Sequence, residues 1–107
     1  MIEQLDVQQL RDLLSRKEPL LLLDVRQPWE HEIARLPDSV LIPLQELPAR
    51  VDEIEPPEGA LVVCYCHHGV RSLTAAAMLA EAGVRAVSLA GGIEAWSELV
   101  DPAMPRY

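Results

Sequence analysis

Short apolar runs recur along the chain, and they limit the folds open to it. They occupy residues 20–25, 61–65 and 86–89. Such runs are typical of strands buried on both faces, as in a parallel sheet that is covered by helices. The segments between them favour helices, and the alternation predicts an α/β fold with a mostly parallel central sheet and helices on both faces. The length allows one such domain over residues 1–107.

Local signals predict the remaining elements. Asp6 and Gln9 have the spacing of a capping box, which predicts a helix over residues 7–16. Pro28 suits the first turn of a short helix, and Pro48 predicts that the helix after Pro43 is irregular. The other expected elements are a strand over 39–42, a helix that follows Cys66 and runs to about residue 82, and a last helix over 93–99.

A cysteine stands where one of these strands gives way to a helix. Cys66 follows the 61–65 run and begins the sequence Cys66-His67-His68-Gly69-Val70-Arg71-Ser72. Ligands of parallel α/β sheets bind at the carboxyl ends of the strands. A short loop there can direct backbone N–H groups at one sulfur atom, and a helix N-terminus favours a thiolate. The sequence therefore predicts that Cys66 is a nucleophile.

The expected binding loop consists of His67, His68, Gly69, Val70 and Arg71. Arg71 and the helix that begins near it supply positive charge beside the thiolate. The two histidines add positive potential or guide an anionic donor. Gly69 allows a positive φ, which a tight loop around one atom needs.

The second cysteine, Cys64, lies within the strand, where we expect it to be buried as a small apolar residue. Cys64, Cys66, His67 and His68 are all residue types that bind zinc. They fall within five consecutive residues without a second Cys/His cluster, and strand alternation turns some of them apart. We therefore predict no metal site and no cofactor.

Charge and hydropathy exclude other functions. Nine Lys and Arg against 17 Asp and Glu give a net charge of −8, which disfavours nucleic-acid binding. No apolar run reaches the roughly 18 residues of a membrane span. The acidic start, residues 1–6, lacks the basic and apolar regions of a signal peptide. We expect a cytoplasmic protein that binds neither nucleic acid nor membranes.

Three stretches together resemble the single-domain rhodanese family over nearly the whole chain. They are Leu23-Asp24-Val25-Arg26 with Trp29-Glu30, the Cys66 loop, and Gly91-Gly92-Ile93-Glu94-Ala95-Trp96. The chain departs from the family pattern at Ala34-Arg35-Leu36, where Gly-His-Ile is usual, so no role is carried over for a family histidine there. The resemblance implies a rhodanese-like domain.

The resemblance also implies a reaction, that of a thiosulfate-type sulfurtransferase. Cys66 takes a sulfane sulfur from a small donor such as thiosulfate and holds it as a persulfide. An acceptor then removes the sulfur, and cyanide, a thiol or a protein cysteine can serve. The loop N–H groups would hold the charged outer sulfur as they would an oxyanion.

Two other functions stay open on the residues alone. One is a non-catalytic binding or regulatory module, because fold does not fix function. The other is a cysteine phosphatase or arsenate reductase. In the phosphatase motif five residues separate Cys from Arg, whereas residues 67–70 are only four, so the ring of N–H groups here is narrower and suits sulfur better than phosphate.

Outside the loop, Asp24 and Arg26 could shape the pocket and Trp29 and Trp96 could line a substrate path, but we favour structural roles for all four. Asp24 and Arg26 should form an ion pair that fixes nearby loops. Trp29 and Trp96 should pack against the core, and His31 should be a partly exposed helix residue.

Overall fold

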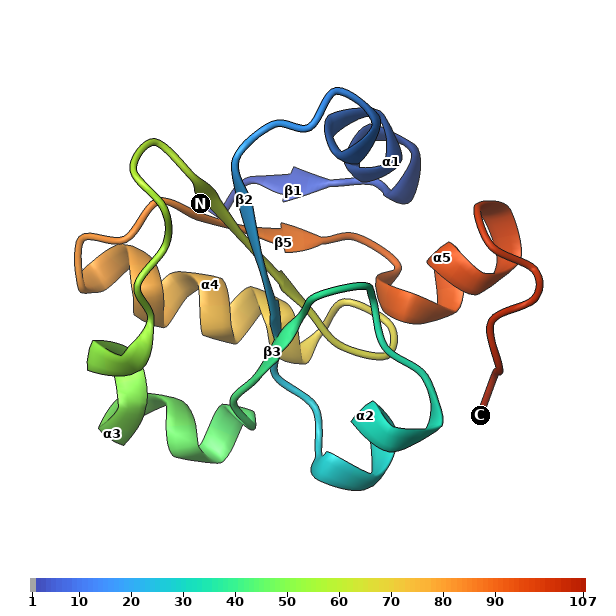
Figure 1. The fold of residues 1–107 in the computed structure, drawn as a ribbon. Helices are drawn as coiled ribbons and strands as arrows, with labels where there is room; N and C mark the ends of the chain where they lie inside the picture. Colours follow the sequence, from blue (N-terminus) through green and yellow to red (C-terminus); the bar gives the residue numbers. More distant parts are fainter. Residues whose placement is uncertain (1) are drawn as a thin grey trace.

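The computed structural model describes residues 2–107, whose strands form one five-stranded sheet (Figure 1). Met1, part of the acidic start considered above, lies outside the described residues. The strand order is β1-β5-β4-β2-β3, and every neighbouring pair is parallel. The strands are β1 Gln4–Leu5, β2 Leu20–Asp24, β3 Val40–Leu41, β4 Leu61–Tyr65 and β5 Ala86–Leu89. The predicted α/β fold is confirmed.

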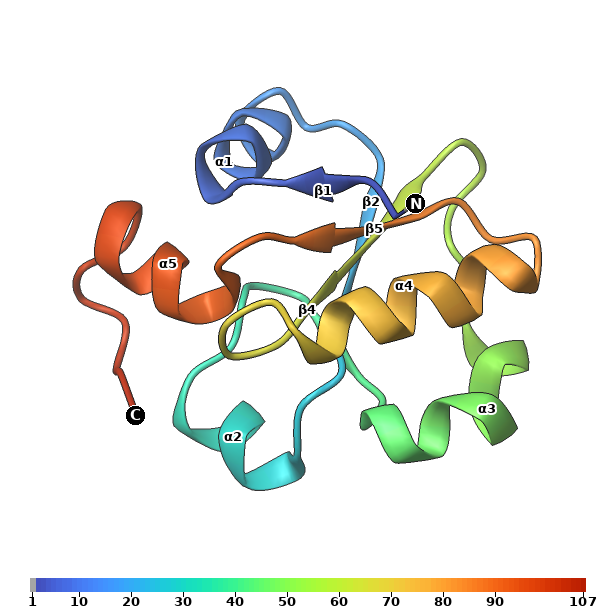
Figure 2. The same ribbon diagram turned by 180° about the vertical axis from the view of Figure 1, so that it is seen from behind.

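Helices cover both faces of the sheet (Figures 1 and 2). They are α1 Val7–Ser15, α2 Pro28–Ile33, α3 Leu47–Arg50, α4 Arg71–Glu81 and α5 Gly92–Leu99, with 3-10 turns Leu44–Glu46 and Val51–Glu53 flanking α3. Helices α1 and α5 lie on one face, and α3 and α4 lie on the other. Among residues 2–107, no helix combines the length and the apolar character that crossing a membrane requires.

The local signals in the sequence act as expected. The Asp6 side chain accepts a hydrogen bond from the Gln9 N–H at 2.8 Å, and the Gln9 side chain accepts one from the Asp6 N–H at 2.8 Å. This capping box begins α1 by pairing N–H groups that lack helical partners. Pro28 is the first residue of α2. Around Pro48 the chain is divided between α3 and two 3-10 turns, which is the predicted irregularity.

Strand β4 is buried on both faces, and this explains its apolar sequence. Val63 and Tyr65 belong to the core cluster that contains residues of α1 and α5. Val62 and Cys64 belong to the opposite cluster, which contains residues of α3 and α4. Successive side chains of a strand point to opposite faces, so every position of this strand meets a helix layer. Cys66 follows at the carboxyl end of β4.

Two features of the fold differ from what the sequence predicted. Strand β1, which pairs with β5 through Gln4 and Leu5, was not predicted. Trp29 is 57% exposed, although we expected it to pack in the core, whereas Trp96 is buried as predicted.

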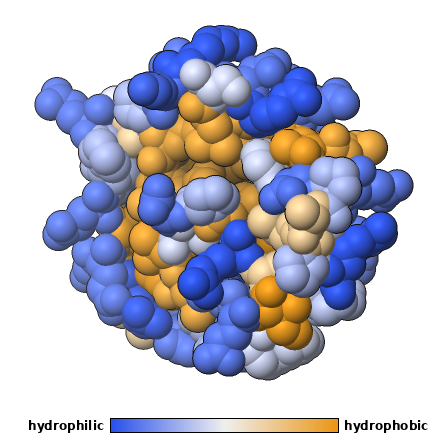
Figure 3. Space-filling model, turned by 45° about the vertical axis from the view of Figure 1, so that its right-hand side comes forward, coloured by the Kyte–Doolittle hydropathy of each residue, from blue (hydrophilic) through white to orange (hydrophobic). Residues whose placement is uncertain are grey.

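On the face that includes α5, hydrophobic side chains gather near the centre and hydrophilic ones surround them (Figure 3).

Candidate functional site

The Cys66 sulfur lies inside the turn that joins β4 to α4. Its side chain is buried, with 1% of the residue exposed. The sulfur accepts hydrogen bonds from the Gly69 N–H at 3.2 Å and from the Ser72 N–H at 3.4 Å. Gly69 has a φ of 99°, a value that L side chains rarely adopt, and this conformation turns the loop around the sulfur. Two backbone N–H groups of this turn therefore converge on one sulfur atom.

Two serines, neither singled out from the sequence, form a hydrogen-bonded pair of which Ser72 contacts the sulfur. The Ser72 hydroxyl oxygen lies 3.5 Å from the Cys66 sulfur and 2.7 Å from the Ser88 hydroxyl oxygen. Both serines are fully buried. Ser72 is the last residue of the Cys66–Ser72 motif, so its place in that motif could have indicated a role at the sulfur. Ser88 comes from β5, and only the strand pairing brings it here.

The loop is fastened to the beginning of α5 by backbone hydrogen bonds. The Ile93 N–H donates to the Cys66 carbonyl at 2.9 Å, and the Glu94 N–H donates to the His67 carbonyl at 3.0 Å. Gly92 makes this approach possible. A Cβ atom there would lie 2.4 Å from the His67 carbonyl oxygen and 2.5 Å from that of Cys66, and its φ is 60°. The Gly91-Gly92 pair thus positions the loop as well as making a turn.

We predict that Gly92→Ala lowers the free energy of unfolding more than Gly83→Ala does. Both residues have positive φ, but a Cβ atom at Gly83 would meet nothing within 4 Å. Gly83→Ala is therefore the matched control, because it measures only the cost of placing an alanine at positive φ. We expect Gly92→Ala to cost a further ~1–3 kcal/mol, because the loop backbone must shift. Urea unfolding of the two variants measures the difference, and equal losses would contradict the proposed close approach.

Arg71 is paired with a carboxylate from α2. Its two terminal nitrogens donate to the Glu30 carboxylate oxygens at 2.7 and 2.9 Å. The hydrogen bond with Glu30 raises the pKa of Arg71, and the nearby Cys66 contributes to the rise. We expected Arg71 to lend its charge to the thiolate; in the structure its strongest contacts are with Glu30. Arg71 therefore also connects the Cys66 loop to α2.

Tyr107 lies against this pair and was not singled out by sequence. Its hydroxyl donates to Glu30 Oε2 at 2.7 Å and accepts from Arg26 Nη1 at 2.7 Å. Its ring stacks on His67, with centroids 4.1 Å apart, and meets the Trp29 ring edge-on at 5.7 Å. The segment after α5 thus packs beside the Cys66 loop, which no local pattern in the sequence indicates.

The contacts of Glu30 shift its acidity. Burial alone raises the pKa of the Glu30 carboxyl, but hydrogen bonds from Arg71, the Gln27 N–H and Tyr107 together lower it to about 2. These groups all stabilise the carboxylate form. Only 3% of Glu30 is exposed, so solvent screens these interactions little.

The low pKa of Glu30 predicts a loss of stability in acid. An unfolded chain protonates this group near pH 4.5 and the folded chain near pH 2, so the unfolded state binds the proton first as the pH falls. The stabilisation, about 3 kcal/mol, is complete above about pH 5 and disappears between about pH 4.5 and 2. Urea unfolding of wild type and Glu30→Gln should show a stability gap that narrows over this range. A gap that is independent of pH would contradict the prediction.

The ion pair expected between Asp24 and Arg26 is present, and both side chains are fully buried. Arg26 Nη2 lies 2.7 Å from Asp24 Oδ2, and Arg26 Nε lies 2.8 Å from Asp24 Oδ1. His31 is partly exposed as predicted, but its Nδ1 also contacts Asp24 Oδ2 at 2.8 Å. Arg26 also donates to the Ala34 carbonyl, within the segment that departs from the family pattern. These contacts fix the chain between β2 and β3.

The other residues named by sequence lie at different depths. Cys64 is buried as expected, and burial raises the pKa of its thiol to about 12. His67 is partly buried, and its ring stacks on that of His68, with centroids 4.0 Å apart. His68 is exposed, and Val70 is 73% exposed. Of the loop residues, Gly69 makes a direct hydrogen bond to the sulfur.

Comparison with known proteins agrees with this geometry. The family model of the Rhodanese-like domain matches residues 6–99. A sulfurtransferase of Allochromatium vinosum is 38% identical over 98 residues, which cover 91% of this chain and 90% of that protein. The probable adenylyltransferase/sulfurtransferase MoeZ of Mycobacterium tuberculosis is 38% identical over 100 residues, which cover 92% of this chain but 26% of MoeZ.

Solved structures give the same result. A rhodanese-related protein of Thermoplasma volcanium superposes with a TM-score of 0.81 at 27% identity, covering 96% of this chain and 95% of that one. A rhodanese-like domain protein of Staphylococcus aureus has a TM-score of 0.81 at 26% identity, covering 89% of this chain and 91% of that one. With a family model that matches most of its length, this chain belongs to the rhodanese-like domain family.

Proposed function

We propose that this protein is a sulfurtransferase that carries sulfane sulfur on Cys66. The observation that carries the proposal is the set of donors around one sulfur atom, the Gly69 and Ser72 N–H groups. A thiolate is the form of cysteine that attacks sulfur, and such donors stabilise its negative charge. The match to relatives named sulfurtransferase supports the same reaction.

The first step loads the cysteine. The Cys66 thiolate attacks the outer sulfur of thiosulfate, a new S–S bond forms, and the S–S bond of thiosulfate breaks. Sulfite leaves with the electron pair of that bond. The product is a persulfide on Cys66, whose outer sulfur carries a negative charge that backbone N–H donors of the loop would stabilise.

The second step unloads it. A nucleophilic acceptor attacks the outer sulfur, the persulfide bond breaks, and Cys66 departs as a thiolate. The Ser72 hydroxyl, 3.5 Å from the sulfur, can donate to that thiolate while the Ser88 hydroxyl, 2.7 Å away, donates to Ser72. This pair of hydroxyls stabilises the charge that the leaving sulfur regains. Cyanide, a small thiol or a protein cysteine serves as acceptor in this proposal.

Intact mass spectrometry tests the proposal. Incubation with thiosulfate should add one sulfur, about 32 Da, to the folded protein, and cyanide should remove it. Glutathione persulfide is a second donor for the same experiment. A folded protein that gains no sulfur from either donor, although its thiol reacts with an alkylating reagent, would contradict the proposal and favour a non-catalytic module. Hydrolysis of an aryl phosphate instead would favour the phosphatase alternative.

A further inference from the structure

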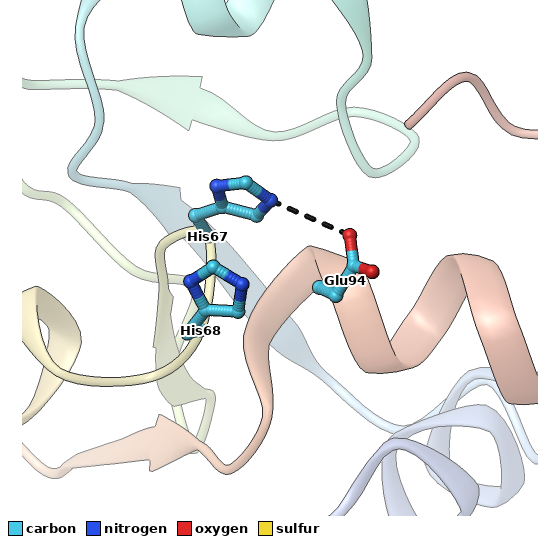
Figure 4. A group of neighbouring side chains, drawn as sticks. All are labelled: His67, His68 and Glu94. Carbon is cyan, nitrogen blue, oxygen red and sulfur yellow. Dashed lines mark hydrogen bonds and ion pairs between the residues drawn. The ribbon is translucent and has the colours of Figure 1, made fainter. Parts of the chain in front are cut away.

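Three side chains of types that bind metals converge at the Cys66 loop. His67, His68 and Glu94 each offer one ligand atom, and these atoms all lie within 4.8 Å of one another. Figure 4 shows the His67 ring directed at Glu94, which comes from the first turn of α5, and the His68 ring beside that of His67. Glu94 is 27 residues from His67 in sequence. The set of Cys64, Cys66, His67 and His68 considered from sequence therefore lacked one of these three side chains.

The distance between two of the ligand atoms already fits a metal. His67 Nε2 lies 3.4 Å from Glu94 Oε1. This is long for a hydrogen bond with a nitrogen donor. Two ligands of a tetrahedral zinc ion, each about 2.0–2.2 Å from the metal, are separated by about 3.4 Å. The pair is thus spaced as zinc ligands are.

The backbone on both sides of this pair is held in place. The Glu94 N–H donates to the His67 carbonyl at 3.0 Å, and the neighbouring Ile93 N–H donates to the Cys66 carbonyl at 2.9 Å. Gly92 allows the two segments to approach this closely. A ligand pair that is fixed before the metal arrives loses less conformational freedom on binding.

The side chains are oriented as well. Arg106 forms hydrogen bonds with Glu94 Oε2, which leaves Oε1 directed at His67. The His67 ring stacks on the Tyr107 ring. Such contacts from outside the ligand set commonly orient metal ligands. His68 is exposed, so its ring can rotate out of the stack with His67 and bring a ring nitrogen to the same ion. The exposure of His68 also leaves the site open to solvent.

We infer that His67, His68 and Glu94 bind a zinc-type divalent ion at the rim of the Cys66 loop. Two imidazoles and one carboxylate are a common ligand set for Zn²⁺, and they leave a fourth position for water or an anion. This differs from our prediction of no metal site. Because His67 directly follows Cys66, a bound ion would also hinder access to the sulfur. This second part rests on the proposed sulfurtransferase function.

Zinc binding is tested first without any sulfur chemistry. Titration of Cys66→Ala with ZnCl₂ against a chromophoric chelator should give one site per chain, and the missing thiol removes binding by Cys66 itself. Adding Glu94→Gln or His68→Ala should weaken Zn²⁺ binding by about tenfold or more. His31→Ala is the matched control, since its side chain is 18% exposed like that of His67 but contacts Asp24, and it should leave the affinity within about twofold. Absence of a site, or equal effects of Glu94→Gln and His31→Ala, would overturn the proposal.

The effect on the sulfur site is tested separately. Zn²⁺ should slow sulfur loading of the wild type, and Glu94→Gln should need about tenfold more Zn²⁺ for the same fractional inhibition. Each protein is compared with its own rate without metal. Zinc binding that does not slow sulfur loading would overturn the inference that the ion hinders access to Cys66, while the zinc site itself would stand. Zinc binding in a protein that takes up no sulfur at all would refute the sulfurtransferase function instead.

Discussion

Cys66→Ala is expected to reduce sulfur loading from thiosulfate by at least about a thousandfold, to the uncatalysed background. The variant removes the sulfur atom to which the Gly69 and Ser72 N–H groups donate. These donors have nothing to stabilise without the thiolate. Intact mass after incubation with thiosulfate measures the loss, and circular dichroism checks that the variant is folded.

Cys64→Ala is the matched control for this experiment. Cys64 lies two residues away, but it is buried within β4, and the pKa of its thiol is raised to about 12. A thiol with that pKa stays protonated near neutral pH and is a poor nucleophile. We expect this variant to accept one sulfur as the wild type does. Loading that survives in Cys66→Ala and is lost in Cys64→Ala would reverse the assignment.

Asp24→Asn should lower the free energy of unfolding by about 3–5 kcal/mol, the typical cost of leaving a buried charge without its partner. Neither Asp24 nor Arg26 has exposed side-chain surface. Asp24 accepts two hydrogen bonds from the Arg26 guanidinium. Without the Asp24 carboxylate, the positive charge of Arg26 stays buried, where water cannot solvate it. Urea unfolding of the variant near pH 7 measures the loss.

Glu53→Gln provides the comparison for this prediction. It makes the same change from carboxylate to amide, in an ion pair with Arg50 that is exposed to solvent. Exposed pairs contribute little, so the loss should be far smaller than for Asp24→Asn. Replacing the buried pair together, as Asp24→Leu with Arg26→Met, should recover part of the stability. Similar losses for Asp24→Asn and Glu53→Gln would argue against a strong role for burial.

The elements that the sequence predicted well are those with a local cause. The apolar run of β4, the capping box of Asp6 and Gln9, and Pro28 at the start of α2 each act over a few residues. The position of Cys66 follows from the same logic, because a loop must join a buried strand to the next helix. Periodicity and capping are properties of neighbouring residues, and sequence displays them directly.

The features that were missed depend on contacts between distant parts of the chain. Strand β1 has only two residues, too few for any periodicity, and it exists because β5 offers an edge for pairing. The contacts of Glu30 with Arg71 and Tyr107 span 41 and 77 residues. Ser88 reaches Ser72 through strand pairing in the same way. Such contacts follow from the topology, which one sequence alone does not display.

The exposed Trp29 gives this molecule an optical reporter close to its cysteine. Its indole meets the Tyr107 ring, and that ring stacks on His67, the residue after Cys66. Trp96 is buried in the core and contributes a steady fluorescence background. A Trp96→Phe variant would therefore confine the emission to Trp29. Events at the loop would then be followed in real time by the intensity and wavelength of one natural fluorophore, without a label.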